Sequence, residues 1–94
     1  MKAFEIEYRA HMRAIYDMAE ERNWRFSRLG ALLDKMEALR VARARFEDSE
    51  TPESEALARW TLEDRRSELN QMMHAWCLTE YEKDNIRWFE MNAE

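Results

Sequence analysis

The sequence predicts an all-α fold, an antiparallel bundle of three long helices with or without a short fourth helix at the C-terminal end. One glycine and one proline in 94 residues leave few sharp turns, which disfavours a sheet protein. Residues that are apolar except for one arginine recur at alternating spacings of four and three over residues 58–76, which is the rhythm of a helix seam. Two earlier stretches carry the same rhythm, so each can pack a stripe against that seam. The seam consists of Ala58, Leu62, Arg65, Leu69, Met72 and Trp76.

Composition indicates one folded domain over residues 1–94. Hydrophobic residues make up 46% of the chain and include four Trp, four Phe and seven Met. These side chains supply the burial that offsets chain entropy, which argues against disorder. A single cysteine, Cys77, excludes an internal disulfide and favours a reducing compartment. The first residues mix acids and bases instead of forming an apolar signal segment, so we expect a cytoplasmic protein.

The first helix is predicted over Lys2–Glu21 and the second over Ser27–Glu47. No proline or glycine precedes Gly30, so the boundary rests on Asn23 and on Ser27 as an N-cap. Gly30 costs the second helix about 1 kcal/mol relative to alanine, and a close helix contact would explain it. The first stripe is Phe4, Tyr8, His11, Ile15 and Met18, and the second is Leu32, Met36, Leu39, Arg43 and Phe46.

The start of the third helix is the strongest local signal in the chain. Thr51 is a good N-cap, and Pro52 suits the first helical position. Glu53 and Glu55 then fall in the first turn, where the helix dipole favours acids. The short connection predicts that the second and third helices are antiparallel neighbours.

The C-terminal part has two interpretations. No breaker follows Pro52 before Asp84, so one helix can exceed 30 residues, about 45 Å, whereas its companions reach about 30 Å. Its far end would then be bare and would form an interface, in a homodimer or with another protein. The alternative is a short fourth helix that starts near Asp84 and folds back. The predicted partner-binding residues are Leu78, Tyr81, Trp88 and Phe89.

A basic stretch raises nucleic-acid binding as the alternative function. Residues 22–45 carry seven bases and two acids, and their aromatic neighbours suit stacking on bases. The net charge of −5 and the seven acids in residues 46–64 favour internal charge pairing instead. The candidate nucleic-acid-binding residues are Arg22, Arg25, Arg28, Arg40, Arg43 and Arg45.

Other sites are weaker. His74 and Cys77 lie three residues apart and could contact one metal ion with His11 or an acid, but zinc sites usually show two such pairs. Cys77 is equally interpreted as a small buried hydrophobe. We therefore predict no metal and no cofactor. The acidic loop 47–55 could imitate a row of phosphates, although it also serves as a turn and a helix start.

The sequence favours a non-enzymatic interaction protein. It shows no nucleophile beside a base and no pair of carboxylates at a catalytic spacing. We expect a small acidic helical adaptor or inhibitor of a larger complex, for example a phage-type inhibitor of a host nuclease or defence machine. A homodimer is the expected oligomer, and no stretch has the length and apolar character of a membrane span.

Overall fold

The computed structural model describes residues 2–92 and confirms an all-α fold. Four helices occupy that range, α1 (Ala3–Glu21), α2 (Phe26–Glu47), α3 (Pro52–Ala75) and α4 (Glu80–Met91), and it contains no strand. Within the same range, no helix combines the length and the apolar character needed to cross a bilayer.

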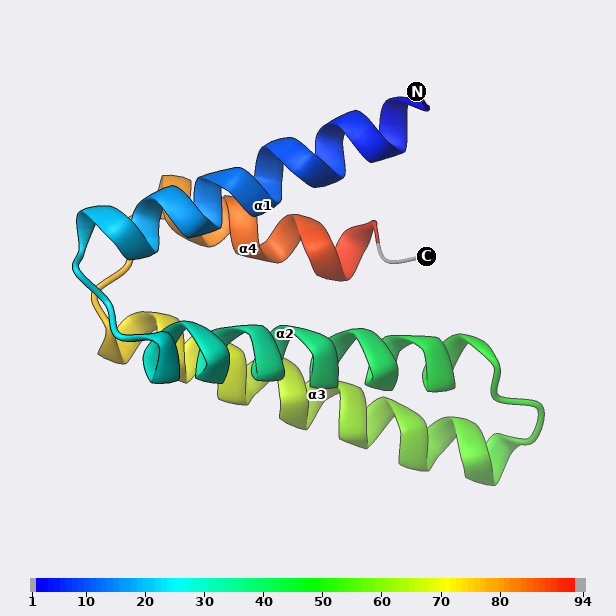
Figure 1. Ribbon diagram of the computed structural model, residues 1–94. Helices are drawn as coiled ribbons and strands as arrows, with labels where there is room; N and C mark the ends of the chain where they lie inside the picture. Colours follow the sequence, from blue (N-terminus) through cyan, green and yellow to red (C-terminus); the bar gives the residue numbers. More distant parts are fainter. Residues whose placement is uncertain (1, 93–94) are drawn as a thin grey trace.

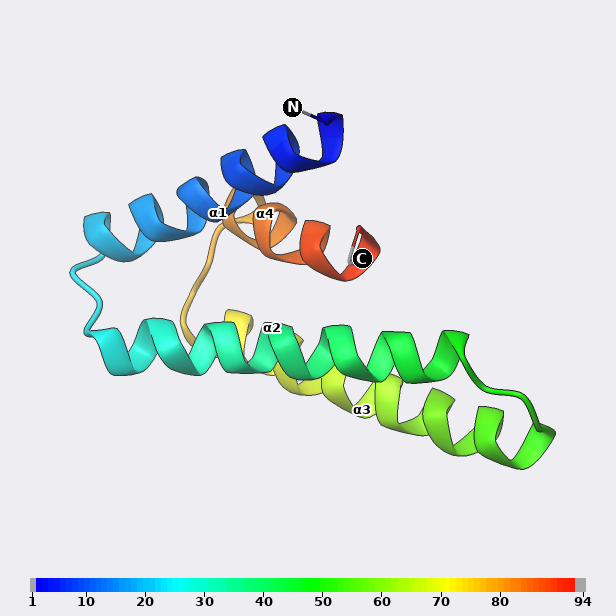
Figure 2. The same cartoon turned by 45° about the vertical axis from the view of Figure 1, so that its right-hand side comes forward.

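The helices associate as two pairs. α2 and α3 form a long antiparallel hairpin, α1 packs against α4, and α4 also contacts α2 (Figures 1 and 2). The prediction that the first helix packs its stripe on the seam of the third is therefore wrong, because α4 takes that place beside α1. In both views the hairpin extends beyond the ends of α1 and α4.

The predicted long third helix ends at Ala75, earlier than expected. Cys77 adopts a left-handed backbone conformation with φ of 57°, and the N–H of Leu78 donates to the carbonyl of Met73 at 3.1 Å. The N–H of Cys77 donates to the carbonyl of His74 at 3.0 Å. These two bonds define a Schellman motif, which usually contains glycine or asparagine where this chain has cysteine. Because cysteine is unusual at this position, no stop signal is visible in the residues that end α3.

A capping box starts α4 at once. The Thr79 hydroxyl accepts from the N–H of Glu82 at 3.2 Å, and the Glu82 carboxylate accepts from the N–H of Thr79 at 2.7 Å. This reciprocal pair satisfies two of the backbone donors that a helix start leaves free. The fourth helix thus begins at Glu80 and not near Asp84. It folds back, as the second interpretation of the sequence expected.

The turn between α1 and α2 repeats the Schellman motif. Asn23 has φ of 54°, and the N–H of Trp24 donates to the carbonyl of Ala19 at 2.9 Å. α2 then begins at Phe26, so Ser27 is not its N-cap, and Arg25 holds that position without a side-chain cap. Trp24 contacts Trp76 edge to face at 5.2 Å, which joins the two turns at one end of the molecule.

The opposite turn confirms the predicted start of α3. The Thr51 hydroxyl accepts from the N–H of Ser54 at 3.1 Å, the Ser54 hydroxyl accepts from the N–H of Thr51 at 3.2 Å, and Pro52 occupies the first turn.

The core follows the middle of the predicted stripes, whereas several members toward their ends are only partly buried and Tyr8 is exposed. Leu69 is 3% exposed, which confirms its place in the seam, but Met73 is buried in place of Met72. Gly30 contradicts its prediction, because an added Cβ would meet no atom within 4 Å. The buried apolar residues are Ile15, Met18, Ala19, Leu32, Met36, Leu39, Ala42, Leu62, Leu69, Met73, Leu78 and Ile86.

Candidate functional site

An aromatic groove lies where α1, α4 and α2 meet. Phe4 stacks on Trp88 at 5.7 Å between ring centroids, and Tyr8 meets Phe89 edge to face at 5.4 Å. Trp88 and Phe89 are themselves 5.0 Å apart. The groove has a volume of about 510 Å³, and its apolar lining consists of Phe4, Tyr8, Met12, Leu33, Met36, Trp88 and Phe89. We call this set the aromatic groove.

The rings of the groove are held in place by a polar contact at its side. His11 stacks on Trp88 at 4.5 Å, and its Nδ1 lies 2.8 Å from Oδ1 of Asn85. Asn85 is 9% exposed and also donates through Nδ2 to the carbonyl of Tyr81 at 3.0 Å. Trp88 stacks on Phe4 and on His11, and the hydrogen bond to Asn85 holds the His11 ring in place. These contacts restrict rotation of the Trp88 ring, so the groove has a defined wall.

The lining is only partly covered. Tyr8 is 44% exposed, and Phe4, Met12, Trp88 and Phe89 are half-buried. α2 supplies a charged rim: Asp34 is exposed, and the Glu37 carboxylate accepts from Arg40 at 2.9 Å. Hydrogen bonding from Arg40 lowers the pKa of Glu37. An apolar centre with a polar rim is the arrangement found in protein–protein interfaces.

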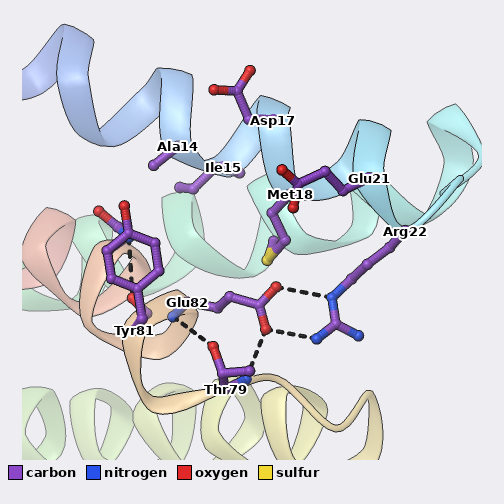
Figure 3. A pocket seen from close by; sticks show the side chains of 10 residues that line it. Ala14, Ile15, Asp17, Met18, Glu21, Arg22, Thr79, Tyr81 and Glu82 are labelled. Atoms are coloured by element: carbon purple, nitrogen blue, oxygen red, sulfur yellow. Dashed lines mark hydrogen bonds and ion pairs between the residues drawn. The ribbon is translucent and has the colours of Figure 1, made fainter.

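A second groove lies at the other end of the α1–α4 pair (Figure 3). Arg22, from the end of α1, reaches Glu82 of α4, with Nε at 2.8 Å and Nη2 at 2.6 Å from its two oxygens. The hydrogen bonds from Arg22 lower the pKa of Glu82, and the bonds to Glu82 raise that of Arg22. The same carboxylate caps α4, so this ion pair ties α1 to the first turn of α4.

A third contact anchors the far end of α4. The Glu90 carboxylate accepts hydrogen bonds from Arg66 of α3 and from Arg43 of α2. Its side chain is 10% exposed, whereas those of Arg43 and Arg66 are 31% and 41% exposed. Bonding to Glu90 raises the pKa of Arg66. One carboxylate thus holds α4 against both helices of the hairpin.

The four predicted partner-binding residues fall in three different environments. Leu78 is 5% exposed and belongs to the core, so the prediction of a bare helix end is wrong there. Tyr81 is 72% exposed and lines the second groove with Arg22. Trp88 and Phe89 lie together in the aromatic groove. They pack on Phe4 and Tyr8, which the sequence placed in a stripe but not in a site.

The six arginines do not form one basic face. Arg22 pairs with Glu82, Arg40 with Glu37, and Arg43 with Glu47 and Glu90. Arg28 lies over the ring of Trp76 at 5.0 Å. Arg25 and Arg45 are exposed. About 25 Å of helix separates Arg28 from Arg45 at 1.5 Å per residue.

The remaining candidates do not assemble. Within residues 2–92, no three His, Cys, Asp or Glu side chains come close enough to hold a metal ion. Cys77 is exposed, which contradicts its interpretation as a buried hydrophobe, because the left-handed turn places it at the surface. In the acidic loop, Glu47 pairs with Arg43 and Glu55 with Arg59.

The aromatic groove could have been anticipated only in part. The segment Thr79-Glu80-Tyr81-Glu82 has the pattern of a capping box, and this signal marks the start of α4. With α4 starting there, Trp88 and Phe89 fall in the third turn of a helix that returns beside α1. The contribution of Leu33 and Asp34 from α2 has no such local signal.

No family model matches the chain, and the comparisons with curated proteins and with solved structures likewise give no match. The groove is therefore interpreted from its own geometry.

Proposed function

We propose that this protein is a non-enzymatic, cytoplasmic interaction protein, an adaptor or inhibitor whose aromatic groove binds a helix of a larger protein complex. The observation that carries the proposal is the cluster of half-exposed rings at the meeting of α1, α4 and α2. Trp88, Tyr8 and Phe89 contact one another and remain open to solvent. Trp and Tyr are the residue types most enriched among interface hot spots.

A helix fits this groove better than a small ligand does. The walls of the groove are themselves helices, and an amphipathic partner helix can pack its apolar face between them. Met12 and Met36 line the groove beside the rings, and flexible methionines adapt to different apolar side chains. Glu37 is paired with Arg40 of the same rim, so Asp34 is the charge that favours a partner helix with a basic residue beside its apolar stripe.

Nucleic-acid binding is the rival function, and the ion pairs of the arginines weigh against it. Arg22, Arg40 and Arg43 already neutralise acids of this chain, so phosphate contacts would compete with those pairs. Retention on DNA or RNA that falls steeply with salt would support the rival, since phosphate contacts release counterions.

Two tyrosines of α1 provide a matched test. Tyr8 is 44% exposed and lines the aromatic groove, whereas Tyr16 is 49% exposed and lies outside it. The immobilised protein would be used to capture partners from its native cell, and each captured protein would be purified and titrated directly. We expect Tyr8→Ala to weaken binding by at least about 10-fold, whereas Tyr16→Ala leaves the affinity unchanged.

Circular dichroism would verify that both variants are folded. Equal loss of binding in the two variants, or none in Tyr8→Ala, would show that the groove is not the binding surface. Capture of nucleic acid in place of protein, lost when Arg25 and Arg28 are replaced, would support the rival function.

A further inference from the structure

The end of the α2–α3 hairpin leaves a large surface uncovered. The chain exposes 6770 Å², about 1,000 Å² more than the ~5,800 Å² expected for a monomer of this mass. Its radius of gyration is 14.4 Å, whereas about 12 Å is expected for a compact chain of this length. In Figures 1 and 2 the turn between α2 and α3 projects beyond α1 and α4, and we attribute the extra surface to this projecting end.

A ridge and a groove lie side by side on this projecting end. Leu57 and Trp60 are 68% and 65% exposed, and their spacing of three places them on neighbouring turns of α3. Beside them, a groove of about 520 Å³ runs between α2 and α3. Leu57 forms part of its wall, and its lining also includes the small Ala42, Ala58 and Thr61 and the charged Arg45, Asp48 and Glu50. We call Leu57 and Trp60 the hairpin ridge, and this second feature the hairpin groove.

We propose that the hairpin end is the dimer interface of this protein, in which the hairpin ridge of each copy packs into the hairpin groove of the other. A two-fold axis requires a patch that is complementary to itself, and a ridge next to a groove meets that requirement. Packing of ridges into grooves is also the usual way in which helices associate. The occupant of the groove is therefore a second copy of this chain.

The part of the groove away from its charged residues can lose its water at low cost. Ala42 and Ala58 contribute only methyl groups, and the Thr61 hydroxyl already donates to the carbonyl of Leu57 at 3.0 Å. Burial of this region therefore leaves no hydroxyl without a partner. The small side chains also allow a bulky ring such as Trp60 to approach the helix backbones.

Area and charge both favour a second copy. A standard interface buries about 800 Å² per partner, which is close to the excess surface of about 1,000 Å² on this chain. The two arms of the hairpin end carry opposite charges: residues 38–46 contain three arginines and no acid, and residues 47–57 contain five acids and no base. Arg40 and Arg43 already pair with acids of their own chain, so in a two-fold dimer Arg45 of each copy is the base that can approach the acids at the α2–α3 turn of the other copy.

Sedimentation velocity on the full chain tests the proposal. We expect the wild type to be dimeric at about 10 μM, because interfaces of this area bind at micromolar affinity or tighter. The ridge variant is Trp60→Ser, which leaves the lining of the hairpin groove unchanged, and it should weaken dimerisation by at least about 30-fold, as loss of a hot spot does. The control is Phe26→Ser, which removes a ring that is 93% exposed at the start of α2, and it should remain dimeric.

A second variant separates the groove from the ridge. Thr61→Arg fills the hairpin groove and leaves the ridge intact, so it should also be monomeric alone. When Thr61→Arg is mixed with the ridge variant, the intact ridge of the first chain can pack into the intact groove of the second. This single contact should give a heterodimer that is weaker than the wild-type dimer. Unchanged circular dichroism would show that both variants are folded.

Several outcomes would overturn the proposal. A monomeric wild type would do so, as would a ridge variant that dimerises like the wild type or a Phe26→Ser control that loses dimerisation equally. Tyr8→Ala lies in the aromatic groove and should remain dimeric. Its loss of dimerisation would assign self-association to the aromatic groove and refute the hairpin interface, whereas partner binding through that groove is tested separately.

Discussion

Gly30→Ala tests the packing of α2 directly. Glycine inside a helix is less favourable than alanine by about 0.8–1.0 kcal/mol, because the unfolded chain has more backbone freedom to lose. At this position the added methyl group would meet no atom within 4 Å, so no clash offsets that gain. We expect a stabilisation of about 1 kcal/mol, which raises the melting temperature of a domain of this size by about 4–8 °C.

The reverse substitution on the same helix is the control. Ala44 is exposed on α2, and Ala44→Gly should lower stability by about the same 1 kcal/mol. The two positions are about 21 Å apart along the helix, so the double variant should match the wild type within about 0.5 kcal/mol. Urea unfolding followed by circular dichroism measures all three variants. A less stable Gly30→Ala would refute the reasoning and restore the close helix contact that the sequence suggested.

Two further substitutions address the core and the α1–α4 ion pair. Leu69→Ala should destabilise the protein by about 2–5 kcal/mol, because Leu69 is 3% exposed, and a denaturant midpoint equal to that of the wild type would contradict its place in the seam. The hydrogen bonds from Arg22 lower the pKa of Glu82 in the folded protein. The contribution of Glu82 to stability is therefore fully present above its unfolded pKa of about 4.3, and it is lost as the pH falls through its lower, folded pKa. Glu82→Gln should therefore lose less stability than the wild type on acidification below about pH 4.3, as measured by urea titrations at each pH, and equal losses would show that the pair contributes nothing.

The predictable part of the fold is the part encoded by local residues. Thr51 and Pro52 fixed the start of α3, and the four–three spacing placed Leu62 and Leu69 in the core. The break between α3 and α4 was missed because Cys77 occupies a left-handed position that glycine usually takes. The turn is stabilised by tertiary packing, because Leu78 and Met73 are both buried and their burial holds the turn closed.

The candidate site was predictable only to the same extent. Trp88 and Phe89 stood out as aromatic residues off the seam, and they do lie together. Their partners on α1 could not be assigned, since a helix that carries Phe4 and Tyr8 can pack on any neighbour with an apolar face. The turn at Cys77 decides that α1 packs on α4. Because this turn was not predicted, the contacts of Phe4 and Tyr8 with Trp88 and Phe89 were not predicted either.

The pairing of α1 with α4 brings together the two ends of the chain. His11 bonds Asn85 across 74 residues, whereas Lys35 and Glu68 join the hairpin across only 33. Contacts between distant residues form late in folding, because the ordering of the intervening chain must come first. We therefore expect the α2–α3 hairpin to form before α1 and α4 meet, and we expect local opening to release α1 and α4 before it releases the hairpin. The aromatic groove then exists only after both ends of the chain have met, and trimming either end removes one of its walls.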